Sequence, residues 1–125
     1  MNQGSESYVY RCRLRRVIDG DTIVCDVDLG FGVILVNQKI RFKGINTPES
    51  RTRNLAEKAL GLQAKARVKE LIQKKFEMKT FKDKKGKFGR IIGIPLTEKG
   101  KSVCDILIKE GHARQYDGGK REPWT

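Results

Sequence analysis

Acidic and amide side chains stand at two points where a strand pattern breaks, although the chain is strongly basic. Asp21 closes the turn at residues 19–21, and Glu49 closes a longer strand pattern just after Asn46 and Thr47. Neighbouring strand ends can bring such groups together. Hard cations such as Ca²⁺ bind carboxylate, amide and backbone carbonyl oxygens. Asp21, Asn46 and the Thr47 carbonyl are therefore candidate metal ligands. Glu49 is a candidate to orient or deprotonate a water molecule.

Two arginines complete this set. Arg41 lies within the strand pattern that precedes Asn46, and Arg90 follows a basic turn. A guanidinium group binds two phosphate oxygens at once and stays charged at any working pH. Cations that absorb negative charge on a phosphoryl group, together with a carboxylate near the attacking water, are what phosphodiester hydrolysis requires. Each feature alone is more typical of an ordinary turn or a solvated strand, so the prediction depends on their joint occurrence.

The charge balance favours a polyanionic partner. The 125 residues include 27 Lys and Arg against 15 Asp and Glu, a net charge of +12. Such an excess attracts nucleic acid at long range, and an anionic membrane surface is a weaker alternative. No apolar run is long enough to span a bilayer. We expect a nucleic acid substrate, no membrane partner and, for a small and highly charged domain, a monomer.

The cysteines and the N-terminus bear on the compartment. Cys12, Cys25 and Cys104 are far apart and odd in number, which favours buried free thiols over disulfides or a zinc site. No signal region is visible at the N-terminus. The sequence as given therefore predicts a cytoplasmic protein, and secretion stays open if a leader was removed.

Alternating and helical patterns must position these residues. Strand patterns begin at Tyr8 and then cover 23–29, 33–45, 76–80 and 88–96, and helical patterns cover 55–74 and 101–110. Residues 1–7 are predicted to be a disordered tail and 8–125 a single domain. We expect an α+β, mainly β fold, namely a five-stranded OB-fold barrel with about two helices. A split sheet packed on helices is the alternative.

Four segments together make the sequence resemble the staphylococcal nuclease (thermonuclease) family, as a short single-domain member. They are VIDGDT at 17–22, RFKGINTPE at 41–49, KFGR at 87–90 and, more weakly, IKEGHA at 108–113. The similarity extends over about residues 8–116. It implies an OB-like barrel and Ca²⁺-dependent hydrolysis of DNA and RNA that yields 3′-phosphate ends.

The resemblance also implies roles for individual residues. Asp21 would bind the metal directly, and Thr47 would offer its main-chain carbonyl. Glu49 would hold or activate the attacking water. The phosphate-binding and nucleotide-binding groups would be Arg41, Arg90, Lys87 and, near the base, Tyr116.

Two departures from the family pattern alter these expectations. Asn46 stands where the family usually has aspartate, so the site loses one negative charge, and we expect one Ca²⁺ ion bound with reduced affinity. The chain also stops at Thr125, where larger relatives continue into a further helix, and Trp124 is a candidate to pack back as a substitute lid.

The main alternative to a nuclease is a non-catalytic OB-fold module that binds nucleic acid. A protein-interaction barrel is a third, weaker alternative.

Overall fold

Five strands form a sheet that closes on itself in the order β1-β2-β3-β6-β5. The computed structural model describes residues 7–81 and 90–124. The elements follow one another as β1 (Ser7–Asp19), β2 (Thr22–Gly30), β3 (Val33–Phe42), β4 (Ile45–Asn46), α1 (Leu55–Leu71), β5 (Lys75–Phe81), β6 (Arg90–Pro95), α2 (Val103–Lys109) and β7 (Arg114–Gln115). The predicted mainly-β fold with a closed five-stranded sheet and two helices is therefore confirmed.

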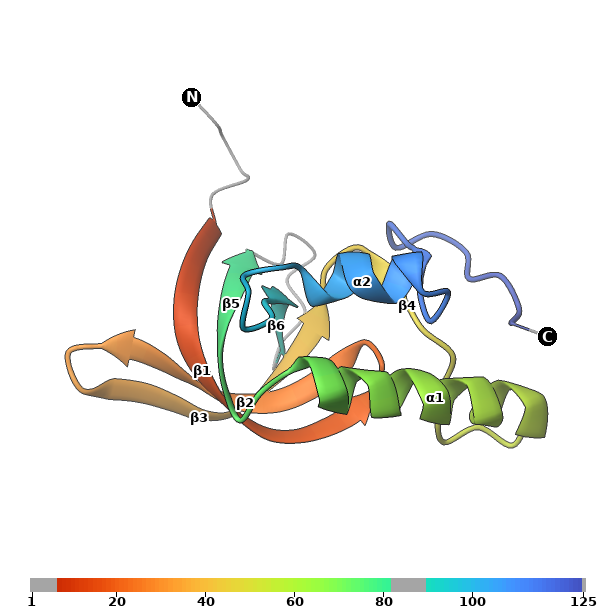
Figure 1. The fold of residues 1–125 in the computed structure, drawn as a ribbon, viewed down its shortest axis with the longest axis horizontal. Coiled ribbons are helices and arrows are strands. Elements are labelled where there is room, and N and C mark those ends of the chain that lie inside the picture. Colours follow the sequence, from red (N-terminus) through yellow and green to blue (C-terminus); the bar gives the residue numbers. More distant parts are fainter. Residues whose placement is uncertain (1–6, 82–89, 125) are drawn as a thin grey trace, which may run out of the picture.

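The pairing explains how the sheet closes. β1 pairs antiparallel with β2 on one side and with β5 on the other, and β2 pairs antiparallel with β3. β3 and β6 run parallel over four residue pairs, from Lys39 with Arg90 to Phe42 with Gly93. β5 pairs antiparallel with β6, and β4 and β7 make a separate short ladder. Both helices lie on the side of the sheet away from the projecting β2–β3 hairpin (Figure 1).

The core lies inside the closed sheet and beneath the two helices. Its largest buried side chains come from the strands and from both helices. They include Ile23, Val27, Ile40, Phe42, Ile45, Val68, Met78 and Leu107.

All three cysteines are free and buried, as predicted. Burial raises the pKa of Cys104 to about 12. A hydrogen bond with Cys12 and burial raise the pKa of Cys25, so neither thiol ionises near neutral pH.

Several predicted boundaries were wrong. The strand expected over 33–45 ends at Phe42, because Gly44 adopts a φ of 75° and turns the chain before β4. The helix expected over 55–74 ends at Leu71, and the one expected over 101–110 covers only Val103–Lys109. Leu29, at the end of the strand pattern over 23–29, is 37% exposed because β2 and β3 extend beyond the rest of the sheet.

Two further predictions meet the limits of the described residues. Of the predicted N-terminal tail, Ser7 belongs to β1, and residues 1–6 lie outside the described part of the chain. Among the helices described, none is long and apolar enough to cross a membrane.

Candidate active site

A small polar cavity opens where the β1–β2 turn, β3 and the segment after β4 meet. Its volume is about 180 Å³. Its walls carry acidic, amide, hydroxyl and basic groups, from Asp19, Asp21, Thr22, Lys39, Arg41, Asn46, Thr47, Glu49 and Arg121. The structure therefore brings together Asp21, Arg41, Asn46, Thr47 and Glu49, five of the residues selected from the sequence.

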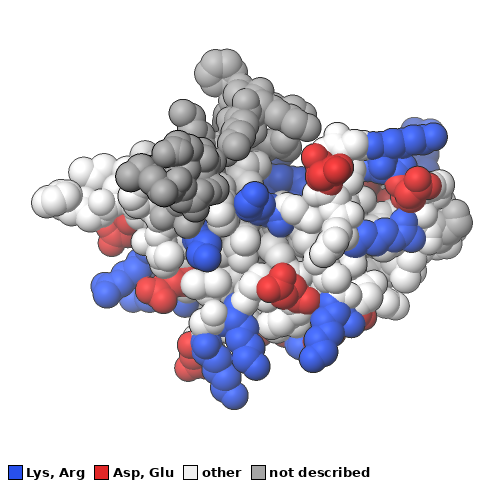
Figure 2. Space-filling model, turned by 90° about the horizontal axis from the view of Figure 1, so that it is seen from above, with Lys and Arg blue, Asp and Glu red and all other residues white. Residues whose placement is uncertain are grey.

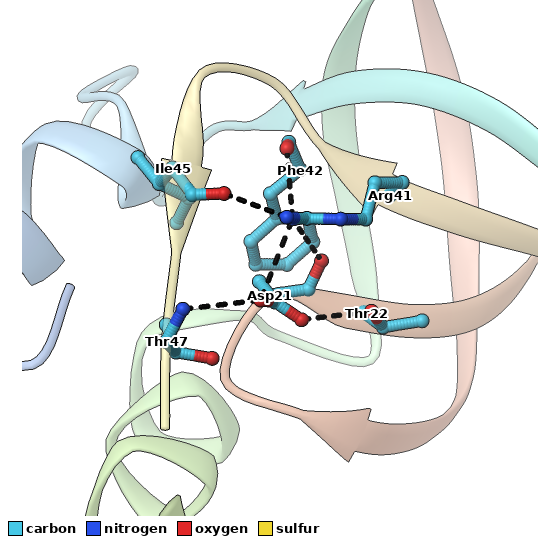
Figure 3. Close-up of polar contacts among 6 residues, drawn as sticks. All are labelled: Asp21, Thr22, Arg41, Phe42, Ile45 and Thr47. Atoms are coloured by element: carbon cyan, nitrogen blue, oxygen red, sulfur yellow. Dashed lines mark hydrogen bonds and ion pairs between the residues drawn. The ribbon is translucent and has the colours of Figure 1, made fainter. Parts of the chain in front are cut away.

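Asp21 is held in a fixed orientation. Its side chain is only 12% exposed. Oδ1 accepts a hydrogen bond from the Thr22 hydroxyl at 2.9 Å, and Oδ2 accepts one from the Thr47 backbone N–H at 3.1 Å (Figure 3). A carboxylate offers about four lone-pair sites, so these two bonds leave acceptor capacity free on each oxygen. Asp21 can therefore anchor the loop at Thr47 and still coordinate a cation.

Arg41 ties the turn after β3 to Asp21. Its Nη2 donates to the Ile45 carbonyl at 2.8 Å, and its Nη1 donates to the Phe42 carbonyl at 3.2 Å and the Asp21 carbonyl at 3.5 Å (Figure 3). Nη1 also lies 3.5 Å from Asp21 Oδ2. The guanidinium is thus a structural brace as well as a wall of the cavity, a role that the sequence did not indicate.

Two glycines allow the site segment to pack closely against α1. A Cβ atom on Gly61 would lie 2.3 Å from the Glu49 carbonyl oxygen, and one on Gly20 would lie 2.7 Å from Ala64 Cβ. Such distances exclude any side chain without displacement of the backbone. Gly61 weakens the helix by its low propensity, but it allows the backbone of Glu49 to rest directly on α1.

Glu49 has a fixed backbone and an exposed side chain. Its neighbours Pro48 and Ser50 are buried, and its backbone N–H donates to Glu57 Oε2 at 3.0 Å. Asn54 caps the same helix end by accepting from the Glu57 N–H at 3.1 Å. The beginning of α1 therefore fixes the place from which the Glu49 carboxylate faces the cavity and solvent.

Asp19 is a further acidic residue of the cavity that sequence reasoning did not select. Its Oδ1 accepts hydrogen bonds from the Ser50 hydroxyl and, at 3.2 Å, from the Ser50 backbone N–H. These bonds link the end of β1 to the segment that carries Glu49. The only available signal was its place beside Asp21 in the Asp-Gly-Asp turn.

The cavity fits a hard cation by the chemistry of its donors. Carboxylate, amide and hydroxyl oxygens line it, and the buried Thr47 Oγ1 has no hydrogen-bond partner in the described part of the chain. Calcium accepts such mixed oxygen sets. Among the described residues, no three acidic, histidine or cysteine side chains converge as a preformed metal cage. A cation bound here would therefore need the Asn46 amide and a backbone oxygen as well as carboxylates.

Two predicted side chains fall outside the described part of the chain, and a third residue lines a neighbouring hollow. Lys87 is outside the described residues. Arg90 begins β6, where its backbone pairs with Lys39, and its side chain is outside the described part. Tyr116 lines a neighbouring hollow instead, and its hydroxyl donates to the Gly119 carbonyl at 2.6 Å.

The C-terminal segment returns towards the site. Trp124 stacks on the Arg114 guanidinium, 3.9 Å from the ring centroid, and the Arg114 side chain donates to the Pro123 carbonyl at 3.1 Å. Arg121, within this segment, lines the cavity and lies 5.3 Å from the Tyr116 ring. The sequence pointed to Trp124 as the residue that packs back, but it gave no signal for Arg121.

Comparison with known proteins agrees with these features. The chain matches the family model "Staphylococcal nuclease homologue" over residues 39–123. It is 35% identical to Endonuclease YncB of Bacillus subtilis (strain 168) over 106 residues. That alignment covers 81% of this chain and 46% of the relative. It is 34% identical over 103 residues to the SPbeta prophage-derived endonuclease YokF of the same organism, covering 81% of this chain and 32% of the relative.

A third relative, Endonuclease YhcR of Bacillus subtilis (strain 168), is 32% identical over 108 residues, which cover 81% of this chain and 8% of the relative. The chain thus spans less than half the length of each of these three relatives. The family model nevertheless includes β4, both helices and most of the cavity wall, and the chain belongs to the staphylococcal nuclease homologue family.

Proposed function

We propose that this chain is a nuclease that uses Ca²⁺ to hydrolyse phosphodiester bonds in DNA and RNA, leaving 3′-phosphate ends. The observation that carries the proposal is that Asp21, Glu49 and Arg41 line one cavity of about 180 Å³. The three relatives named above are all described as endonucleases. The net charge of +12 favours rapid association with a polyanionic substrate.

In the proposed reaction, Glu49 activates the attacking water and the arginines stabilise negative charge on the phosphate. The Glu49 carboxylate accepts a proton from the attacking water or orients it, since its exposed side chain faces the cavity from a fixed backbone. Arg41 and Arg90 neutralise charge on the phosphoryl oxygens, and Lys87 contacts a terminal phosphate. Arg121 adds a further cation at the cavity wall. Tyr116 lies beside Arg121 and supports the base end of a bound nucleotide.

Asp21, Asn46 and the Thr47 carbonyl would hold the cation. A bound Ca²⁺ supplies Lewis-acid stabilisation of charge on the phosphate. Asn46 is only 6% exposed and contributes a neutral amide where a carboxylate would add a charge. We therefore propose one ion per site with reduced affinity.

The proposed substrates are single-stranded DNA and RNA, and we expect little sequence selectivity, because contacts to the phosphate backbone carry no base information. We propose that the protein acts as a monomer, as expected for a small and highly charged domain.

A digestion assay tests the proposal. Single-stranded DNA is incubated with the protein and Ca²⁺, or with a chelator, and the product ends are analysed for 3′-phosphate. We expect metal-dependent cleavage that falls by about 10²–10⁴-fold in Glu49→Gln, the range for loss of a general base. Glu70→Gln is the matched control, because Glu70 is an exposed carboxylate on α1 that does not line the cavity.

A calcium titration tests the neutral ligand separately. Asn46→Asp should lower the Ca²⁺ concentration at half-maximal activity, because the added carboxylate raises the charge of the donor set. An unchanged half-saturation point would remove Asn46 from the proposed ligands without touching the role of Glu49.

A non-catalytic nucleic-acid-binding module is the second candidate. The observation that favours it is Arg41, whose N–H groups donate to three backbone carbonyls, together with the missing charge at Asn46. Retention of DNA in a gel shift, with no cleavage under any divalent cation, would establish this function instead.

A further inference from the structure

The tip of the β2–β3 hairpin is an apolar arm that projects from the closed sheet (Figure 1). We define the hairpin arm as residues 29–36, Leu-Gly-Phe-Gly-Val-Ile-Leu-Val, which include no charged side chain. Its six large apolar residues are all exposed: Phe31 at 104%, Val36 at 57%, Ile34 at 54%, Val33 at 50%, Leu35 at 38% and Leu29 at 37%. In Figure 2 the projecting end of the molecule is correspondingly drawn almost without charged atoms.

The arm is apolar on both of its faces and has an open edge. Successive strand residues point to opposite faces, so Ile34 and Val36 lie on one face and Val33 and Leu35 on the other. β3 pairs with β6 only from Lys39 to Phe42, and within the described residues nothing pairs with the outer edge of 33–36. A strand that is apolar on both faces is typical of one buried on both sides.

The backbone conformation at the tip is not stabilised by packing against any other described residue. Phe31 adopts a left-handed φ of 56° between Gly30 at 83° and Gly32 at 77°. For a residue with a Cβ atom this conformation costs roughly 1–2 kcal/mol. The Phe31 side chain is completely exposed, so packing within the described chain does not offset that cost.

The root of the arm is rigidly held. Asp26, 7% exposed, accepts hydrogen bonds from Arg15 Nε at 2.9 Å and from the Asn37 backbone N–H at 2.9 Å. Arg15 Nη2 also lies 2.6 Å from the Asp26 carboxylate. The arm is thereby fixed relative to the sheet, which lowers the conformational entropy that it would lose on binding.

A large groove adjoins the arm. Its volume is about 840 Å³, and apolar groups of Cys12, Ile34, Val36, Phe76 and Leu96 contribute to its walls. Its charged walls are balanced: Arg11, Arg13, Arg15 and Lys75 provide four positive charges. Asp26, Asp28, Glu77 and Glu98 provide four negative charges. The groove is therefore locally neutral in a chain of net charge +12, and it suits an uncharged apolar segment better than a polyanion.

We propose that the hairpin arm is a self-association element, through which two copies of this chain pair with the arm of each copy lying in the groove of the other. Every copy carries both the apolar arm and the neutral groove, and the two adjoin through Ile34 and Val36. A two-fold axis beside them forms both contacts at once, as in other symmetric dimers. The neutral surface also allows two strongly basic copies to approach without local repulsion.

The proposed interface is separate from the proposed active site. The groove and the cavity at Asp21 share no wall residue. Pairing through the arms therefore leaves both sites open to substrate, and the inference does not depend on nuclease activity.

Sedimentation velocity from low micromolar to several hundred micromolar protein tests the pairing. We expect the mass to rise with concentration from 14.2 kDa towards twice that value, and more readily at high salt, because salt screens the repulsion between the basic copies. Ile34→Asp should weaken the association at least tenfold. Leu62→Asp is the matched control: Leu62, 48% exposed on α1, resembles Ile34 in size and exposure and lies outside the groove.

Four outcomes would overturn the inference. The wild type could stay at 14.2 kDa at the highest concentration, or both variants could weaken association equally. Co-sedimentation of the monomer with anionic phospholipid vesicles, lost in Ile34→Asp, would instead identify a membrane-inserting arm. Loss of single-stranded DNA binding in that variant, without a change in mass, would identify a nucleic acid surface. Thermal unfolding of both variants checks that each is folded.

Discussion

The same two strands, β2 and β3, carry opposite surfaces at their two ends. At one end Asp21 and Arg41 are charged and largely buried, with side chains 12% and 13% exposed. At the other end the hairpin arm is uncharged and exposed, with Phe31 at 104%. The ordinary distribution, with apolar groups inside and charged groups outside, is reversed at both ends.

The two reversals differ in how they are compensated. The buried charges of Asp21 and Arg41 are satisfied by backbone groups of the same chain, at Thr47, Phe42 and Ile45. The exposed apolar groups of the arm have no such compensation among the described residues, which is why we infer a partner for them. Within the described chain, the charged groups at the first end have partners, whereas the apolar groups of the arm remain uncovered.

Removal of the guanidinium should produce the largest effect. In Arg41→Ala the Phe42 and Ile45 carbonyls and Asp21 lose a donor, and breaking a buried ion pair costs about 3–5 kcal/mol. Chemical denaturation should show that loss in the free energy of unfolding. Arg41→Lys keeps the charge but lacks the planar guanidinium that donates to several carbonyls at once, so it should recover only part of the stability. If both variants are as stable as the wild type, the brace is not a stabilising feature.

Gly61→Ala should produce the next largest loss of stability. Alanine normally stabilises a helix by about 1 kcal/mol relative to glycine. Here the new Cβ would lie 2.3 Å from the Glu49 oxygen, so we expect a net loss of about 1–3 kcal/mol from overpacking. Cleavage should fall with it, because Glu49 is displaced.

Gln63→Ala, at an exposed position of the same helix, is the control and should change little. Stabilisation by Gly61→Ala would show that the site segment does not depend on close contact with α1.

The ionised Asp26 at the root of the arm should make the free energy of unfolding depend on pH. The hydrogen bond from Arg15 and that from the Asn37 backbone lower the pKa of Asp26 below its ordinary value of 3.8. A lowered folded pKa stabilises the fold above pH 3.8, and this contribution is lost as the pH falls through the folded pKa. Asp26→Asn should therefore flatten the acid limb of a plot of unfolding free energy against pH. An equally steep limb in the variant would contradict this role.

Phe31→Gly should have the smallest effect on the monomer. It relieves the left-handed φ of 56° but increases the freedom of the unfolded chain, so the free energy of unfolding should change by less than about 1 kcal/mol. Thermal unfolding at low concentration measures this, and sedimentation at high concentration should show weaker pairing. Strong destabilisation of the monomer would mean that Phe31 supports its own copy.

Local patterns were enough to predict much of the fold and several site residues. Alternation gave the strands because one face of the sheet is buried, and Ile23, Ile40 and Phe42 are indeed in the core. The boundaries at Gly44 and Leu71 could not be predicted, because they depend on where the chain meets other elements. Leu29 and residues 33–36 show the same limit, since their pattern does not reveal that nothing in the described chain covers them.

The sequence by itself determined the chemistry available: carboxylates, an amide and arginines in a basic chain, in the order that marks its family. Only the tertiary structure decided what each group contacts. Arg41 braces three backbone carbonyls, Gly61 receives the backbone of Glu49, and Asp19 and Arg121 join the cavity. These contacts join residues distant in the chain, so their partners are set by how the sheet closes and how α1 packs, which no local pattern encodes.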